Sequence, residues 1–348
     1  MLRTLARSRL RDRALLGVGA AAAALAGGLL TAGPASAAPS SQTPLTTTAG
    51  GPLTGGDPGV LHVTSGADAG WYVYSTGGNS INVAKAGAVA GPYSAPAATL
   101  SPQAWFTTAN PGPSDTSHDL WAPSVFSIDG HYVMYFAAYD AGHGQRCVGV
   151  AEAAHPMGPF TVVSGTNPIC APQAANYQGQ KAEAIDPSFY KAPSGQRYLL
   201  FKAGTADRYN VAIYSYKMQA SGEKRESGTP SVVLRTKGSG LVNAIENPDL
   251  IAHGGKLYLF VSADYFGNCS YRTDVYSASS ITTFTRSQTP IHLLTQASTG
   301  LCGPGGASVT TNGATIVYHA WQGGSPSSKV RDDYTASLTW TASGPSVS

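Results

Sequence analysis

The sequence repeats a short motif about every sixty residues. Each copy begins with a short motif that ends in proline in four of the five cases. An apolar pair follows, and an aromatic-rich segment comes after a polar turn. The copies are centred on Pro58, Pro123, Pro187, Pro248 and, without the proline, Ala307. Successive copies lie 65, 64, 61 and 59 residues apart. This spacing predicts five similar units, because one small sheet cannot bury both of its faces alone and needs similar neighbours to cover them.

The residues within each unit favour strands joined by tight turns. Turn signals such as Asp129-Gly130 and Asn312-Gly313 separate segments rich in Tyr, Val and Phe. Charged residues make up only 12% of the chain, and the Leu, Lys and Glu stripes of a helical bundle are missing. We therefore predict an all-β fold, a five-bladed β-propeller over residues 54–348. A pair of β-sandwiches is the alternative, but it does not explain five evenly spaced motifs.

The N-terminal segment has the pattern of a secretory signal peptide over residues 1–37. Five arginines lie within the first 13 residues, an apolar segment follows, and Ala35-Ser36-Ala37 forms a small-x-small cleavage site. An uncleaved membrane anchor is the alternative, because the apolar segment is roughly one membrane span long. Residues 38–53, rich in Ala, Pro, Ser, Thr and Gly, are predicted to be a disordered lead-in. We expect a secreted, extracellular protein with no membrane contact after cleavage.

Net charge and cysteines agree with export. The net charge of +3 includes five Arg and one Asp of the leader, so 3 − 4 leaves −1 on the mature chain. A protein that binds nucleic acid needs a basic face, so we exclude nucleic acid as a partner. Four cysteines in an exported chain predict two disulfides, with three pairings open. Proximity in the sequence favours Cys147–Cys170 and Cys269–Cys302.

Three of the motifs carry a carboxylate, at Asp57, Asp186 and Glu246. The first strand of each blade lies nearest the propeller axis, so these side chains are expected to face one central cavity. Glycoside hydrolysis needs one carboxylic acid to protonate the leaving oxygen and one carboxylate to activate water, roughly 6.5–9.5 Å apart for inversion. We predict Glu246 as the acid, because its side chain is longer and its motif is offset by one residue. The alternative is that all three are turn residues at strand starts.

In this order and spacing the motifs resemble those of glycoside hydrolase family 43, the five-bladed arabinanases, α-L-arabinofuranosidases and β-xylosidases. The matching pieces are Asp57-Pro58, Trp121-Ala122-Pro123, Ile185-Asp186-Pro187, Glu246-Asn247-Pro248 and Tyr318-His319-Ala320-Trp321. The resemblance implies that Asp57 is the general base, that Asp186 tunes the acid and orients the substrate, and that Glu246 is the general acid. We expect Trp121 to form the wall of a sugar subsite, because aromatic rings stack on the C–H faces of sugars.

The chain departs from the family pattern at two positions. Asn247 stands where the family usually has glycine, and Asn tolerates unusual backbone angles better than most residues. Gly306 stands where relatives have a histidine that often binds a metal or water in the channel. This departure argues against a channel calcium, which is the alternative to our expectation that no metal or other cofactor is required. We expect His319 to be a buried, hydrogen-bonded histidine rather than its replacement.

The sequence thus predicts a secreted, inverting glycoside hydrolase that acts on a polysaccharide or oligosaccharide. The resemblance implies arabinofuranosyl or xylosyl linkages in plant cell-wall polysaccharides. One alternative is a fructan- or sucrose-cleaving enzyme on the same fold, although its N-D-P-N and R-D-P signatures are missing. The other alternative is a non-catalytic sugar-binding propeller, against which the presence of all three carboxylates argues.

Overall fold

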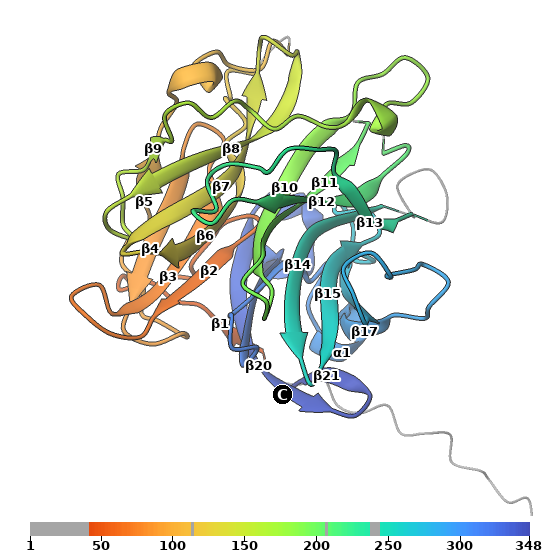
Figure 1. Ribbon diagram of the computed structural model, residues 1–348. Helices are drawn as coiled ribbons and strands as arrows, with labels where there is room; N and C mark the ends of the chain where they lie inside the picture. The colour runs from red at the N-terminus through yellow and green to blue at the C-terminus, as the bar shows by residue number, and fades with distance from the viewer. Residues whose placement is uncertain (1–41, 113–114, 206–207, 237–243) are drawn as a thin grey trace, which may run out of the picture. The chain divides into compact units, whose positions relative to one another are not determined.

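The computed structural model describes residues 42–112, 115–205, 208–236 and 244–348. The predicted signal segment, residues 1–37, lies outside the described residues, as does the start of the predicted lead-in. The strands of the unit that spans residues 38–348 form five antiparallel sheets (Figure 1). Within the described part of the chain, no helix is both long and apolar enough to cross a membrane.

Four of the sheets follow the order of the chain from their inner strand outward. They contain β2 (Gly59–Val63), β3 (Gly70–Thr76), β4 (Ile81–Ala86) and β5 (Ala97–Leu100); β6 (Trp121–Ile128), β7 (His131–Asp140), β8 (Gln145–Ala153) and β9 (Thr161–Val162); β10 (Glu183–Lys191), β11 (Arg197–Gly204), β12 (Ala212–Met218) and β13 (Ser231–Arg235); and β14 (Ile245–His253), β15 (Lys256–Ala263), β16 (Arg272–Ala278) and β17 (Ile291–Leu294). Each sheet is one blade, and we number the blades I to IV in chain order.

Blade V combines the two ends of the described chain. It consists of β18 (Gly305–Val309), β19 (Thr315–Trp321), β20 (Arg331–Thr341) and β1 (Thr43–Pro44), and β21 (Gly344–Val347) pairs with the end of β20. The inner strands contact their neighbours in a closed ring, from β2 through β6, β10, β14 and β18 back to β2. The five-bladed propeller predicted from the repeat is confirmed. Among the described residues, helical structure is confined to α1 (Gln296–Thr299) and a few 3₁₀ turns.

The predicted disorder of residues 38–53 is wrong for residues 42–53. Thr43 and Pro44 form β1, which pairs with Thr335 and Tyr334 of β20. Leu45 and Leu53 are 0% and 2% exposed and belong to the apolar cluster between blades V and I. The local composition is that of a disordered segment, but the segment is ordered because its strand partner lies at the other end of the chain.

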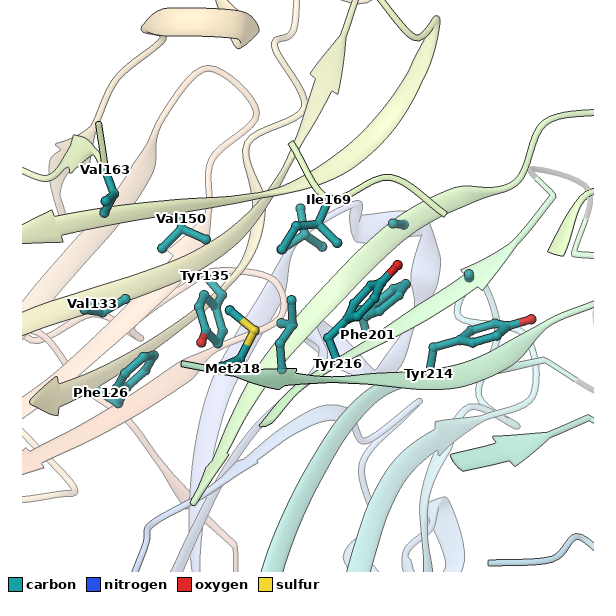
Figure 2. Close-up of a cluster of buried hydrophobic side chains, with 14 of the residues drawn as sticks. Phe126, Val133, Tyr135, Val150, Val163, Ile169, Phe201, Tyr214, Tyr216 and Met218 are labelled. Atoms are coloured by element: carbon teal, nitrogen blue, oxygen red, sulfur yellow. The ribbon is translucent and has the colours of Figure 1, made fainter. Parts of the chain in front are cut away.

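Apolar side chains fill each space between neighbouring blades. Successive residues of a strand point to opposite faces of the sheet, so each strand serves two clusters. In β7, Val133 and Tyr135 face blade III, whereas Met134 and Phe136 face blade I. Figure 2 shows the cluster between blades II and III, which contains Val133 and Tyr135 of β7 and Met218 of β12. Coverage of both faces explains why these strands read as continuous apolar segments rather than alternating ones.

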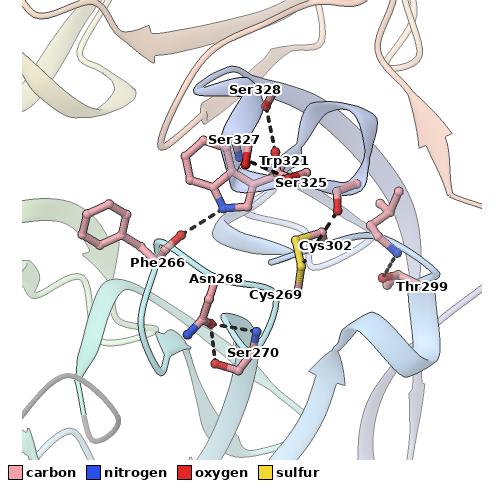
Figure 3. Close-up of a disulfide and its surroundings, with 12 residues drawn as sticks. Phe266, Asn268, Cys269, Ser270, Thr299, Cys302, Trp321, Ser325, Ser327 and Ser328 are labelled. Carbon is pink, nitrogen blue, oxygen red and sulfur yellow. Dashed lines mark hydrogen bonds between the residues drawn. A yellow bond between two sulfur atoms is a disulfide. The ribbon is translucent and has the colours of Figure 1, made fainter.

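Both predicted disulfide pairings are confirmed. The Cys147–Cys170 disulfide joins β8 of blade II to the segment that follows β9. Cys269–Cys302 joins the loop before β16 to the loop before β18, and so connects blades IV and V (Figure 3). Beside it the Trp321 indole N–H donates a 3.0 Å hydrogen bond to the carbonyl of Phe266. The loop that carries Phe266 is therefore held to blade V at two points.

Candidate active site

A pocket of about 380 Å³ opens where the inner strands begin. Its walls include Asp57, Asp186 and Glu246, which come from blades I, III and IV, and the predicted Trp121 from blade II. The three carboxylates therefore line one cavity, as predicted. Four cationic side chains also line the pocket: Arg146, Lys202, Arg208 and Arg331.

The residue just before the motif proline has a left-handed backbone in every blade. The φ angles are 51° at Asp57, 48° at Ala122, 54° at Asp186, 47° at Asn247 and 60° at Gly306. In β6, β10, β14 and β18 the pairing register shifts at this place, which marks a β-bulge. A bulge breaks the alternation of a strand and redirects its side chains. This local conformation turns the motif residues of each blade toward the axis.

The three carboxylates do not occupy equivalent backbone positions in their blades. Asp57 and Asp186 are the left-handed residues of their blades, whereas Glu246 precedes the left-handed Asn247. Glu246 is thus the counterpart of Trp121 and Ile185. The one-residue offset noticed in the sequence is a real difference in backbone position.

Asp57 lies between blades I and V. Its Oδ2 accepts a 3.0 Å hydrogen bond from the Thr76 hydroxyl, and its backbone N–H donates to Nδ1 of His319 at 2.9 Å. Arg331 Nη1 lies 3.9 Å from Oδ1. Burial raises the pKa of Asp57, and the Arg331 charge opposes part of that rise. Burial also holds the pKa of His319 well below its usual value, so the ring is neutral, and its predicted buried, hydrogen-bonded state is confirmed.

Glu246 is held by a donor on each carboxylate oxygen. Lys202 Nζ lies 2.8 Å from Oε2, and the Tyr271 hydroxyl donates to Oε1 at 2.9 Å. Burial acts to raise the pKa of Glu246, but the Lys202 charge and these hydrogen bonds outweigh it and hold the pKa below its usual value. The result is a buried ion pair, since Lys202 is itself only 7% exposed.

The pKa of Asp186 is shifted in the opposite direction from that of Glu246. Burial raises the pKa of Asp186 to about 7, and the charges of Glu246 and Asp57 add to the rise. Its Oδ2 accepts a 3.0 Å hydrogen bond from the backbone N–H of Asn247. We expected Asp186 to keep Glu246 protonated near neutral pH. The pKa directions run against this expectation, raised at Asp186 and lowered at Glu246, because Lys202 compensates the charge of Glu246.

Lys202 and Tyr271 were not predicted from the sequence. Lys202 is the one charged residue inside the apolar segment Tyr198–Gly204, and a lysine in a buried strand needs a partner. That signal could have identified it. Tyr271 has no such signal, because it belongs to a loop and reaches Glu246 only through the fold.

The predicted Trp121 does line the pocket, but the guanidinium of Arg146 lies 4.2 Å above its ring and covers one face.

A calcium ion in the channel would have to be held by the groups around Gly306 and Asp249. A Cβ at Gly306 would lie 2.5 Å from Cε1 of His319, so the His319 ring fills the space beside this glycine. Deeper in the channel both oxygens of Asp249 accept backbone N–H groups, from Leu250 and Val309. Calcium takes six to eight oxygen ligands, and these groups leave few oxygens free. That the protein requires no metal remains a prediction.

Comparison with known proteins identifies related sequences. The family model of glycosyl hydrolases family 43 matches residues 99–345. The arabinan endo-1,5-alpha-L-arabinosidase A of Aspergillus niger is 27% identical over 225 residues, which cover 65% of this chain and 62% of that protein. An extracellular exo-alpha-(1->5)-L-arabinofuranosidase of Streptomyces avermitilis is 27% identical over 220 residues, which cover 58% of this chain and 42% of that protein. The chain thus spans less than two thirds of the length of these relatives.

Solved structures share the fold. A thermostable family-43 glycoside hydrolase has a TM-score of 0.65 and 21% identity, with 88% of this chain and 96% of that chain covered. An exo-1,5-α-L-arabinanase from a bovine ruminal metagenomic library also has a TM-score of 0.65, with 19% identity, and covers 85% of this chain and 97% of that chain. These likenesses establish the architecture of the propeller.

Proposed function

Since the chain belongs to glycosyl hydrolase family 43, we propose that it is an inverting glycoside hydrolase that cleaves arabinofuranosyl linkages in plant cell-wall polysaccharides. The observation that carries the proposal is the meeting of Asp57, Asp186 and Glu246, from three blades, in one pocket. Relatives named for arabinan and for arabinofuranosyl linkages support this sugar. Xylosyl linkages are the second candidate, because the sequence motifs also resemble those of β-xylosidases.

In the proposed mechanism Asp57 is the general base. It takes a proton from a water molecule, whose oxygen forms a bond to the anomeric carbon while the bond to the leaving oxygen breaks. Glu246 gives its proton to that leaving oxygen. Hydrogen bonds from Thr76 and Asn247 and the charge of Arg331 favour the ionised form of Asp57, which is the form a base needs.

The acid must carry a proton although Lys202 favours its ionised form. Asp186 and Glu246 are close enough that the charge of Glu246 raises the pKa of Asp186. Such a pair shares one proton near neutral pH and titrates as a unit. We infer that turnover uses the form in which this shared proton lies on Glu246. In that form Asp186 is ionised, and its negative charge favours the protonated state of Glu246.

We propose that aromatic rings of the pocket bind the sugar. The rings of Trp121 and Phe266 both line the pocket and offer apolar surface to the C–H face of a sugar.

We propose that the protein is secreted. Two disulfides and the signal-like pattern of residues 1–37 support secretion, because disulfides persist mainly in oxidising compartments.

The direct test replaces the acid and the base. We expect Glu246→Gln and Asp57→Asn each to lower kcat on arabino-oligosaccharides by ~10²–10⁴-fold, the usual contribution of a positioned proton donor or acceptor. Thermal unfolding should change little, and Asp129→Asn in the exposed β6–β7 turn is the matched control. Wild-type rates in either variant would refute the roles.

The same preparation separates the alternatives. Proton NMR of the first product formed distinguishes inversion from the retention expected of fructan- and sucrose-cleaving enzymes. Binding of arabino-oligosaccharides without turnover by the wild-type chain would favour the sugar-binding propeller. A parallel assay on xylo-oligosaccharides decides between the two candidate sugars.

A further inference from the structure

One residue in the pocket, Asn247, is linked to all three carboxylates through its backbone, its side chain and the neighbouring Tyr271. Asn247 donates its backbone N–H to Asp186 Oδ2 at 3.0 Å and its side-chain Nδ2–H to Asp57 Oδ1 at 3.4 Å. Its Oδ1 lies 2.9 Å from the Tyr271 hydroxyl, which also lies 2.9 Å from Glu246 Oε1. We propose that the Asn247 side chain is a positioning residue that, with the Tyr271 hydroxyl, favours a protonated Glu246 and an ionised Asp57 at the same time.

This inference rests on the proposed function, in which Glu246 is the acid and Asp57 the base. It concerns a residue at which the chain departs from the glycine usual in the motif. The left-handed backbone, with φ of 47°, is a conformation that Asn adopts more readily than most residues. The side chain is therefore presented to the pocket without unusual strain.

The orientation of the Asn247 amide follows from its partners. A carboxylate oxygen can only accept a hydrogen bond, so the amide nitrogen must face Asp57. The amide oxygen then faces Tyr271, whose hydroxyl can donate. Burial raises the pKa of Tyr271 well above its usual value, so this hydroxyl keeps its hydrogen. The reverse orientation would place two acceptors against each other at Asp57.

The Tyr271 hydroxyl has one hydrogen, and two acceptor oxygens lie 2.9 Å from it, Glu246 Oε1 and Asn247 Oδ1. The Ser262 hydroxyl also forms a hydrogen bond with it. When Glu246 is ionised, the hydrogen points to Glu246 Oε1. When Oε1 carries a proton, Glu246 becomes the donor to the Tyr271 oxygen, and the Tyr271 hydrogen turns to Asn247 Oδ1. Without Asn247 Oδ1, the second arrangement leaves the Tyr271 hydrogen to the Ser262 hydroxyl, whose oxygen already accepts the Gly306 N–H at 2.8 Å. The Asn247 side chain thus stabilises the protonated acid selectively.

The other contact acts in the opposite sense on the base. Nδ2 of Asn247 donates to Asp57, and a donor to a carboxylate stabilises its ionised form. One amide therefore supports unlike protonation states on two neighbouring carboxyl groups. An inverting reaction needs these unlike states in the same molecule.

Several charged and titratable groups from the surrounding strands also face the two carboxylates. Around Glu246 they are Lys202, Asp186, Arg208 and Tyr271, and around Asp57 they are Arg331, His319, Asp333 and Glu246. The variants proposed below leave these groups unchanged, apart from Tyr271→Phe and from Glu246→Gln, which serves only to assign a signal. A shift in the titration of Glu246 or Asp57 can therefore be assigned to the Asn247–Tyr271 pair.

The test begins with Asn247→Gly, which keeps the left-handed backbone and the N–H to Asp186 and removes only the side chain. Loss of one hydrogen bond should shift each pKa by about 0.5–1 unit. The pKa of Glu246 should fall and that of Asp57 should rise, so the bell-shaped pH dependence of kcat/KM should narrow from both sides. The substrate must be an arabino-oligosaccharide, because a nitrophenolate group departs without help from the acid.

Tyr271→Phe separates this device from general damage to the pocket. It removes the donor to ionised Glu246, so the basic limb should move up in pH, opposite to its shift in Asn247→Gly. In the Tyr271→Phe background, Asn247→Gly should move only the acidic limb. Asp129→Gly, at an exposed left-handed position with φ of 48°, is the matched control and should move neither limb.

A direct titration makes the test independent of the substrate. The chain has five glutamates, so ¹³C-carboxyl labelling of glutamate gives few signals, and the one lost in Glu246→Gln belongs to Glu246. The five are Glu152, Glu183, Glu223, Glu226 and Glu246. The pKa of Glu246 should fall in Asn247→Gly, rise in Tyr271→Phe, and be the same in the double variant as in Tyr271→Phe.

The outcomes distinguish this inference from the proposed function. An unchanged pKa of Glu246 in Asn247→Gly, or an equal shift with and without the Tyr271 hydroxyl, overturns the inference even if Glu246→Gln is inactive. Wild-type turnover by Glu246→Gln overturns the proposed function, while the titration still decides the role of Asn247. Should Asn247→Gly fail to fold, Asn247→Asp keeps the shape of the side chain. Asn247→Asp replaces the donor to Asp57 by a carboxylate, so it must raise the pKa of Asp57. An unchanged acidic limb in the pH profile of Asn247→Asp would also refute the inference.

Discussion

At the scale of single residues, the three carboxylates of the pocket titrate differently because each has different neighbours. Glu246 faces Lys202, Asp57 faces Arg331, and Asp186 accepts one backbone N–H. Burial acts to raise the pKa of all three, and only at Glu246 do the neighbours outweigh it. Proton placement in this pocket therefore depends on cations contributed by other strands more than on the carboxylates themselves.

Asp186 makes stability depend on pH in a predictable direction. In the unfolded chain this group loses its proton above about pH 4, but in the folded protein it keeps the proton until about pH 7. Folding therefore loses stability as pH rises through that window, since the folded state binds more protons there. Asp186→Asn keeps an oxygen for the Asn247 N–H and removes this penalty.

We expect Asp186→Asn to unfold in urea at a higher concentration than the wild type at pH 8, with a gain on the order of 1–4 kcal/mol. The gain should shrink toward zero as pH approaches 4. Asp129→Asn, an exposed aspartate in a turn, is the control and should show no such trend. A gain that stays constant over this range would mean that Asp186 does not titrate as stated.

How much of the site the sequence could reveal follows from where each residue lies. Asp57, Asp186 and Glu246 belong to a motif that recurs on every inner strand, so the repeat alone brings them to one axis. Lys202 comes from a second strand and Tyr271 from a loop. Their contacts with Glu246 depend on the packing of blade III on blade IV, which no local pattern of residues encodes.

At the scale of elements, turns were predictable and bulges were not. Asp129-Gly130 forms the two-residue turn between β6 and β7, with both residues at positive φ, as its sequence indicates. The bulges of the inner strands carry residues as different as Ala122, Asp186 and Asn247 at the left-handed position. Such variety at the left-handed position gives no sequence signal for the bulge.

The Cys269–Cys302 disulfide is expected to hold one wall of the pocket. It anchors the loop that carries Phe266 and Tyr271 to blade V (Figure 3). Its two cysteines are 33 residues apart, so the double variant Cys269→Ser/Cys302→Ser should lose about 3–4 kcal/mol of unfolding free energy in the loop-entropy account. Because two lining residues lie on the released loop, KM should rise more than kcat falls.

The other disulfide provides the comparison. Cys147 and Cys170 are 23 residues apart, so Cys147→Ser/Cys170→Ser should lose a similar free energy, about 3 kcal/mol. The adjacent pocket residue Arg146 keeps its ion pairs with Asp119 and Glu183, so KM should change less. Equal KM values in the two double variants would show that the Cys269–Cys302 disulfide does not position the wall.

At the scale of the whole molecule, the pocket straddles the seam at which the ring closes. Asp57 belongs to blade I, whereas His319 and Arg331, which contact it, belong to blade V. The repeat predicted five blades, but it gave no indication that residues 42–53 complete the last one. Closure by β1 therefore affects both the stability of the ring and the surroundings of the proposed base.

Leu45 offers the sharpest test of this closure. It is fully buried and packs in one cluster with Val73 of blade I and Val317 of blade V. Leu45→Ala should lower the unfolding free energy by about 2–5 kcal/mol, as measured by urea denaturation, because the cavity lies across the seam. Val232→Ala, at a side chain 36% exposed on the outer strand of blade III, should change it by no more than about 0.5 kcal/mol. Equal stability of the two variants would mean that the N-terminal segment rests on the propeller without closing it, and the surroundings of Asp57 would then need no contribution from β1.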